Sequence, residues 1–198
     1  MMSKAEIQVR IMIGAMTGGR LVSVMAALLV VAAAVAPRMT AEELAAQSEL
    51  IVRGHVTRSW PAWDSRHKYI WTHYEVAVAE MLRGLYSTTV TVSEPGGTLD
   101  GVSMQTSGAV PFAAGEDAVL FLYKTPIGYW RVVGGPQGKF TVDREGRVRT
   151  GSYGVTLVDP PGGATLGTSL AMLQGIPMSD FVTRVRRLAD AHPYLGAQ

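Results

Sequence analysis

The chain has 198 residues, with 18 lysine and arginine residues, 16 aspartate and glutamate residues and no cysteine. This length suits one domain with its own core, and a hydrophobic content of 47% excludes a disordered protein. The lack of cysteine excludes a disulfide framework, a zinc ribbon, thiol catalysis and a lipoprotein anchor.

The first forty residues predict an exported protein. Arg10 and Arg20 precede an apolar run over residues 21–36 that ends in small residues, which is typical of a secretory signal peptide. As a helix, at about 1.5 Å per residue, this run would be roughly 24 Å long and would fall short of the ~30 Å core of a bilayer. We therefore assign residues 1–41 to a signal peptide, with an uncleaved N-terminal anchor as the alternative. Either places the rest of the chain in the periplasm, on the cell surface or in the medium.

Two details of this segment bear on cleavage and charge. Ala32 with Ala34, or Ala34 with Ala36, fits the A-x-A cleavage pattern, and Pro37 hinders cleavage at the second position. The first 36 residues also hold three of the basic residues and one of the acidic ones, which leaves 15 of each sign in the rest. Because the remaining chain has no net basic field, we expect no nucleic-acid partner.

A short helix and a strand follow. Thr40 and Glu43 have the spacing of a capping box, which predicts a helix over residues 41–49. Residues 50–58 then alternate in hydropathy, which predicts a half-buried strand. Residues 60–68 contain Pro61 and are expected to form a polar, aromatic connection.

Several further strands are expected. Residues 69–78 give the strongest strand pattern, and residues 79–83 continue it as one helical turn or a short extension that Gly84 ends. Residues 118–123 are nearly all apolar, which predicts a central strand buried on both faces. The other expected strands cover residues 88–94, 102–106, 129–133, 140–142 and 147–150.

The C-terminal part is expected to be a loose Gly/Pro-rich excursion over residues 151–177, followed by a helix capped by Ser179. Phe181, Val185 and Leu188 form an apolar stripe on this helix, which we expect to pack on the strands. Its arginines lie elsewhere and could instead meet an anionic lipid surface or a partner. They are Arg184, Arg186 and Arg187.

Short strands separated by turns, with helices only at the ends, predict a mainly β fold. We expect a small antiparallel barrel of five to seven strands, similar to the oligonucleotide/oligosaccharide-binding (OB) type, with a short N-terminal helix and a C-terminal helix. The expected domain boundaries are 42–150 for the barrel and 151–198 for the Gly/Pro-rich segment with the last helix.

Residues 48–142 resemble the netrin-like module, which includes the inhibitory domain of tissue inhibitors of metalloproteinases. Residues 49–56 resemble its first strand, residues 74–76 followed by Met81-Leu82-Arg83-Gly84 resemble its second strand and turn, and residues 115–122 resemble a later strand. The resemblance implies an OB-type barrel. The animal inhibitors bind the protease zinc through an N-terminal cysteine, and since this chain has none, that chemistry does not carry over. Residues 134–140, GGPQGKF, are also similar to a segment of exported bacterial proteins to which no activity is assigned.

Motifs for catalysis and for cofactors are weak. Residues 134–139 lack the spacing of a phosphate-binding loop, so we expect a bend with Lys139 as a surface charge. His73 and Glu75 share a strand face and could hold a metal ion only if His55 or His67 came near; we expect a solvated face, on which Trp71 and Tyr69 pack across strands. The sequence thus assigns no catalytic residue, no metal site and no cofactor.

Two kinds of site remain. Trp60, Trp63, Arg66, Tyr69 and Trp71 form an aromatic and basic group that could stack on a partner, or could cover one end of the barrel. We therefore predict an exported, non-catalytic module that binds a protein or glycan through this surface. One alternative is an exported hydrolase that uses loop carboxylates, and another is a structural module tethered to the membrane. The candidate carboxylates are Glu94, Asp100, Glu116 and Asp117, of which the last two are most simply turn charges in water.

Overall fold

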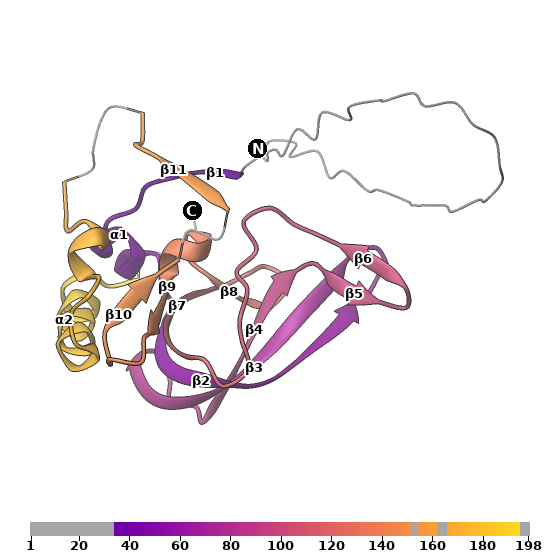
Figure 1. Cartoon of the computed structure of the whole chain (residues 1–198), viewed down its shortest axis with the longest axis horizontal. Coiled ribbons are helices and arrows are strands. Elements are labelled where there is room, and N and C mark those ends of the chain that lie inside the picture. The colour runs from indigo at the N-terminus through magenta and orange to yellow at the C-terminus, as the bar shows by residue number, and fades with distance from the viewer. Residues whose placement is uncertain (1–33, 152–153, 162–165, 195–198) are drawn as a thin grey trace, which may run out of the picture.

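The computed structural model describes residues 34–151, 154–161 and 166–194. In this part the chain is mainly β with two α-helices, which confirms the expected mainly β class (Figure 1). The large sheet is mixed, whereas a purely antiparallel one was expected. The predicted signal segment lies outside the described residues up to position 33. Ala34, which belongs to both A-x-A patterns, and Ala36, which belongs to the second, lie in the first strand, and the cleavage position stays a prediction.

The elements are as follows in chain order. The helices are α1 (Ala41–Ala46) and α2 (Met178–Ala191), with short 3-10 helices η1 (Gly135–Gly138) and η2 (Leu170–Leu173). The strands are β1 (Ala34–Pro37), β2 (Leu50–Trp63), β3 (Ile70–Arg83), β4 (Thr89–Pro95), β5 (Gly97–Leu99), β6 (Val102–Met104), β7 (Asp117–Lys124), β8 (Trp130–Val132), β9 (Lys139–Val142), β10 (Val148–Thr150) and β11 (Val155–Val158).

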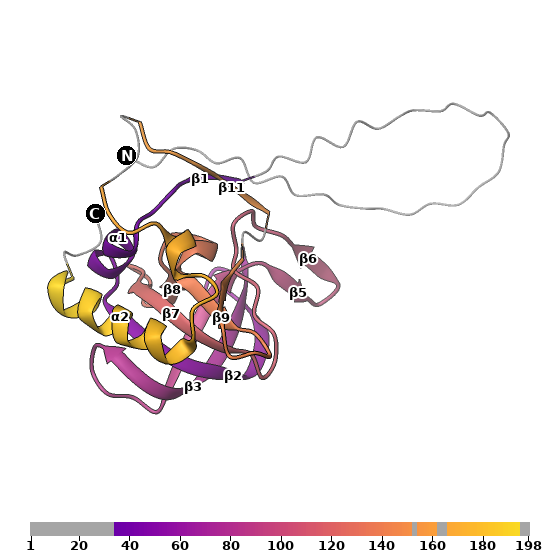
Figure 2. The same ribbon diagram turned by 60° about the vertical axis from the view of Figure 1, so that its left-hand side comes forward.

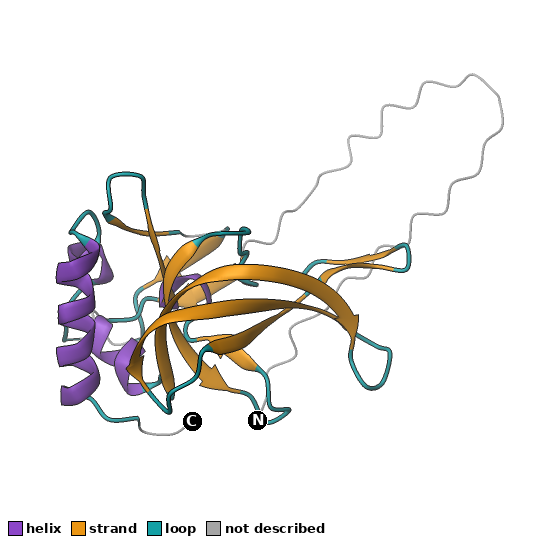
Figure 3. Ribbon diagram, turned by 90° about the horizontal axis from the view of Figure 1, so that it is seen from below, coloured by secondary structure: helices purple, strands orange, loops and turns teal. Residues whose placement is uncertain are grey.

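The main sheet has seven strands in the order β10-β9-β7-β2-β3-β4-β8, and β8 also pairs with β7. All of these pairings are antiparallel except that between β4 and β8, which is parallel and consists of Val92 opposite Trp130. Two small sheets flank it, a β5–β6 hairpin and a parallel β1–β11 pair. The two helices lie at one end of the molecule and the β5–β6 hairpin at the other (Figure 3).

Residues 60–63 were expected in a connection, and this prediction is wrong because they continue β2. They pair with β3 from Trp60 opposite His73 to Trp63 opposite Ile70. The pairing of β2 with β7 ends at His55, so in this stretch β2 has β3 as its one strand neighbour among the described pairings. Pro61 is tolerated there because its missing N–H can face away from the ladder. Of the two expectations for residues 79–83, the extension is confirmed, since they continue β3 without a helical turn and Arg83 lies opposite Ile51.

Two apolar clusters form the core, and β7 contributes to both. Alternate residues Val119 and Phe121 pack with the helices, whereas Leu120 and Leu122 pack with β2, β3, β4 and β8. All four are at most 1% exposed, so the prediction of a central strand buried on both faces is confirmed.

The helix ends differ in how well the sequence predicts them. The capping box of α1 is present, since the Thr40 hydroxyl accepts from the Glu43 N–H and the Glu43 carboxylate accepts from the Thr40 N–H. Ser179 does not cap α2. The helix begins two residues earlier than such a cap would allow, because the N–H of buried Met178 donates to the Gly146 carbonyl at 3.0 Å and Pro177 takes the cap position.

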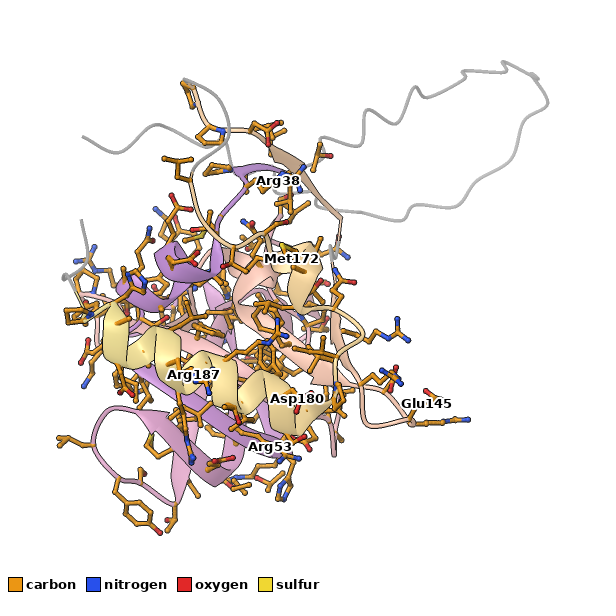
Figure 4. All side chains as sticks on the ribbon, turned by 90° about the vertical axis from the view of Figure 1, so that its left-hand side faces the viewer. Arg38, Arg53, Glu145, Met172, Asp180 and Arg187 are labelled. Carbon is orange, nitrogen blue, oxygen red and sulfur yellow. The ribbon has the colours of Figure 1, made fainter. Side chains whose placement is uncertain are left out.

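The remainder of α2 follows the sequence pattern. Phe181 and Val185 are buried and Leu188 is half-buried in the cluster that also holds α1 and β9. The three arginines are exposed. Figure 4 looks onto this helix and shows Asp180 and Arg187 on its outer side.

The segment 151–177 was expected to be a loose excursion, and its described residues are more ordered than that. β11 pairs with β1 (Figure 2), Leu173 of η2 is buried, and Gly175 donates to the Val148 carbonyl at 2.8 Å. Long-range pairing thus organises a stretch whose glycines and prolines predict no regular element. Within the described ranges, no helix has the length and apolar character needed to cross a membrane.

Arg83 joins the ends of both helices to the sheet. Its guanidinium donates to the carbonyls of Ala45, in the last turn of α1, and Ser48, just after that helix, and to those of Ala189 and His192 at the end of α2. The last carbonyls of a helix lack intrahelical partners and carry partial negative charge. One cation at the end of β3 therefore satisfies acceptors from two helices that are more than a hundred residues apart in the chain.

We predict that Arg83→Met lowers the free energy of unfolding by about 3 kcal/mol, because the carbonyls of Ser48, Ala189 and His192 lose the donor that Arg83 supplies. Arg83→Lys keeps the charge but not the planar fork, and should recover only part of the loss. Urea unfolding followed by far-ultraviolet circular dichroism measures both. A loss below about 0.5 kcal/mol in the methionine variant would contradict this role for Arg83.

Candidate functional site

An aromatic cluster lies on the outer face of β2 and β3, and we define it as Trp60, Trp71, His73 and Tyr129. The ring centroids of Trp60 and His73 are 5.4 Å apart, which follows from their cross-strand pairing. The Tyr129 ring packs edge-on against Trp71 and His73 of β3, with ring centroids 5.0 Å and 5.4 Å apart. The structure thus brings together two of the predicted site residues with two that the prediction did not include.

Tyr129 reaches the cluster from the turn between β7 and β8. Its N–H donates to the Thr125 hydroxyl at 2.9 Å, and its carbonyl accepts from the Thr125 N–H at 2.8 Å. The sequence signals a turn here through Pro126 and Gly128. It does not signal that this turn lies against β3, because that depends on the order of strands in the sheet.

Trp63, Arg66 and Tyr69 lie beyond the cluster, around the β2–β3 turn. The indole N–H of Trp63 donates to the Asp100 carboxylate at 3.0 Å and its ring stacks with His67 at 6.4 Å. Tyr69 has the Lys68 ammonium 5.2 Å from its ring, and Arg66 is exposed. The predicted surface therefore consists of two adjacent groups, the aromatic cluster and this turn group.

Cations hold the tryptophans of the cluster in place. The Arg58 guanidinium lies 4.7 Å from the Trp60 ring and pairs with Glu75 at 2.8 Å. The hydrogen bonds from Arg58 and Thr57 hold the pKa of Glu75 below its usual range. Arg131 lies 6.0 Å from the Trp71 ring. Such contacts position aromatic rings before any partner arrives, which lowers the entropic cost of binding.

His73 was expected on a solvated strand face beside Tyr69, and this prediction is wrong. The residue is 9% exposed, and its Nδ1 lies 2.8 Å from the Ser93 hydroxyl of β4. Burial lowers its pKa, because charging the ring would remove it from water at a cost. The imidazole at the centre of the cluster is therefore neutral near pH 7 and packs beneath the rings around it.

A groove of about 700 Å³ adjoins the aromatic cluster. It runs along β4 to the turns that follow β3 and β7. Its wall residues include His73, Thr89, Thr91, Ser93, Lys124 and Tyr129. Two members of the aromatic cluster thus form one end of a larger concave surface.

The carboxylates of the hydrolase alternative each have a structural partner. Glu94 is 3% exposed and pairs with Arg131 at 3.2 Å, and burial raises its pKa. It lines a second cavity of about 620 Å³ together with Tyr74. Asp100 accepts from Trp63, and Asp117 pairs with Arg53 at 2.8 Å.

Glu116 belongs to an ion pair that corrects two predictions. Lys139, expected at the surface, is 1% exposed, and its ammonium lies 2.7 Å from the Glu116 carboxylate. It also donates to the Pro111 carbonyl and lies 4.3 Å from the Phe112 ring. Lys139 therefore fastens the loop before β7 to β9, and Glu116 is no simple turn charge. Sequence reasoning missed this pair because nothing local marks a lysine as buried.

Among the described residues, no three His, Asp or Glu side chains come together in a group that could hold a metal ion. The chain matches no model of a protein family and no curated protein. The likeness to the netrin-like module therefore stays a prediction.

Acid should destabilise the protein partly through His73. Because the folded state lowers its pKa, the unfolded state binds more protons as the pH falls below about 6.5, and stability is lost in that range. We expect His73→Gln to reduce the drop in unfolding free energy between pH 7.5 and pH 5.0, measured by urea titration. His55→Gln, at an exposed position, is the control. An unchanged drop in the His73 variant would contradict the lowered pKa.

The buried ion pair should respond asymmetrically to truncation. Glu116→Ala leaves the buried Lys139 ammonium without its carboxylate and should cost roughly 3 kcal/mol of stability. Lys139→Met removes the buried charge itself. The charge that remains is that of Glu116, whose side chain is more accessible to water than that of Lys139. This variant should therefore cost at least 1 kcal/mol less than Glu116→Ala. Chemical denaturation of both variants tests the order, and a larger cost for Lys139→Met would show that packing outweighs charge at this position.

Proposed function

We propose that this protein is an exported, non-catalytic binding module that engages a protein or glycan partner through the aromatic cluster and the adjoining turn group. The observation that carries the proposal is the half-exposed pair Trp60 and Trp71, held by cross-strand contacts and by arginines beside a groove. Aromatic side chains that are fixed in advance are the commonest anchors of binding surfaces.

The pattern of strand pairing supports an OB-type barrel. The pairings β2–β3, β3–β4, β4–β8, β8–β7 and β7–β2 lead from strand to strand and back to the first. OB folds bind their ligands on the face of the second and third strands and on the loops after the first and fourth. In this chain those positions are β3, β4, the turn with Arg66 and the turn with Tyr129. The aromatic cluster, the turn group and the groove therefore lie where such a fold would take a ligand.

The sequence of residues 1–41 supports export, and a retained N-terminal anchor remains the alternative to cleavage. A hydrolase is less well supported, because Glu94, Glu116 and Asp117 are each engaged by a cation and Asp100 by an indole N–H. A structural module tethered to the membrane draws support from the exposed arginines of α2 alone. The balanced charge of the folded part gives no support to a nucleic-acid partner.

The binding role predicts that Trp60→Ala combined with Trp63→Ala removes partner capture. Each lost aromatic anchor should cost about 2 kcal/mol, so capture from an extract of envelope and medium should fall by well over tenfold. The matched control is Leu166→Ala with Met172→Ala, which removes apolar side chains that are 98% and 67% exposed elsewhere on the surface.

Circular dichroism of both double variants checks that the fold is intact, and protease treatment of the retained species separates a protein from a glycan. If the tryptophan variant retains the same species in the same amount, the aromatic surface is not the binding site. Loss in both double variants would mean that general apolar adhesion explains the capture.

A further inference from the structure

One wall of the groove is an incomplete strand edge. β4 pairs with β3 over Thr89–Pro95, from Thr89 opposite Ala77 to Pro95 opposite Trp71. On its other side, its pairing in the described part of the chain is the single match of Val92 with Trp130. A parallel ladder continued from this match would place Gly128 beside Val90. The chain instead turns at this point, with the Gly128 N–H donating to the Thr125 carbonyl at 2.8 Å.

The backbone groups of this edge face the groove. Val78 donates to the Thr88 carbonyl at 2.9 Å, so Thr88 and every second residue after it direct their backbone groups to β3. The N–H and C=O groups of Thr89 and Thr91 consequently point to the opposite side, where the groove lies. The parallel match of Val92 with Trp130 places the Thr91 carbonyl and the Ser93 N–H against Trp130, so the groups left toward the groove are those of Thr89 and the N–H of Thr91. At Thr89, the Ser87 hydroxyl makes the hydrogen bonds that a neighbouring strand would otherwise make. It donates to the Thr89 carbonyl at 2.6 Å and accepts from the Thr89 N–H at 3.4 Å.

Exposed apolar side chains adjoin this edge. Leu85, which lines the groove, and Tyr86, the residue after it, are 91% and 84% exposed, and Ile127, the residue before the lining residue Gly128, is 63% exposed. Leu50, Val90 and Trp130 also line the groove. Large apolar residues concentrated around a concave surface mark a site that another molecule covers.

The charges of the groove select the chemistry of its occupant. Lys124 and Glu49 contribute one charge of each sign to the lining, which gives no preference for a polyanion such as nucleic acid. The complementarity lies in the peptide dipoles, because donors and acceptors repeat along the edge at two-residue intervals of about 7 Å. An extended polypeptide repeats its own donors and acceptors at the same interval, whereas a saccharide does not.

We propose that an extended peptide segment of a partner protein adds to β4 as a further strand, pairing with Thr89 and Thr91 and placing an apolar side chain between Leu85 and Ile127. This is strand addition, in which main-chain hydrogen bonds supply affinity and pockets for alternate side chains supply specificity. The proposal rests on the binding role proposed above and names the class of partner for that role.

The test is a selection of phage-displayed random ten-residue linear peptides on the purified full chain. The most enriched peptide is then synthesised with a fluorescent label and measured by fluorescence anisotropy. We expect peptides without proline that have apolar residues at alternate positions. N-methylation of the peptide at every second residue should weaken binding at least tenfold in one register and leave it within twofold in the other, because only alternate N–H groups face β4.

Two protein variants locate the site. Ile127→Glu should weaken the same peptide at least tenfold. Thr91→Pro should do so as well, since it removes an N–H that points away from β3 and so leaves that ladder intact. Arg144→Glu, in the exposed turn between β9 and β10, is the control for charge and should have no effect. The N-methylated peptides keep the test decisive if Thr91→Pro fails to fold.

The proposal is overturned if no linear peptide is enriched, if both N-methylation registers behave alike, or if Ile127→Glu binds normally. If sedimentation shows a dimer and Ile127→Glu dissociates it, the edge binds a second copy of the chain, and the proposal of a partner peptide is overturned. The aromatic surface is judged separately. If the Trp60/Trp63 double variant loses its partner while no peptide is selected, the binding role stands and strand addition fails. If that variant keeps its partner while peptides bind the groove, the aromatic surface is not the binding site and strand addition stands.

Discussion

The long antiparallel ladder between β2 and β3 is the constraint on which the other features depend. Its register decides that Trp60, Trp71 and His73 face outward, while Val52 and Val76 face the core. A slip of one residue would exchange these two sets. The two strands approach so closely that a Cβ at Gly54 would lie 2.3 Å from the Ala77 carbonyl oxygen, which leaves glycine as the residue that fits there.

The two ends of this ladder have different roles in the structure. At one end Arg83 binds the carbonyl ends of both helices, so the helices and the sheet stabilise each other. At the other end the ladder extends beyond β7 and carries the tryptophans, where β4 pairs along β3. The aromatic cluster on this ladder lies beside the edge of β4, which is only partly paired. The fixed rings favour a preformed binding surface, and the open part of the β4 edge leaves room for a partner to complete the sheet.

Local patterns predicted what is local. Thr40 and Glu43 predicted the start of α1, and the apolar run at residues 118–123 predicted the central strand. Partners distant in sequence explain most of the differences. Residues 60–63 extend β2 because β3 lies beside them, Lys139 is buried because Glu116 meets it, and Tyr129 joins the cluster because the β7–β8 turn lies against β3. Strand order and long-range ion pairs leave no periodic signature in a single sequence, so such features could not be predicted.

The most direct test of the binding surface is site-specific photo-cross-linking on the full chain in the cells that produce it. A benzophenone amino acid replaces the exposed Arg66 of the turn group, or Leu166 as a control elsewhere on the surface, and irradiated samples are compared by mass. A discrete adduct at position 66 that is missing at position 166 is the predicted result. No adduct at position 66, or the same set of adducts at both positions, would contradict a partner-binding role for this surface.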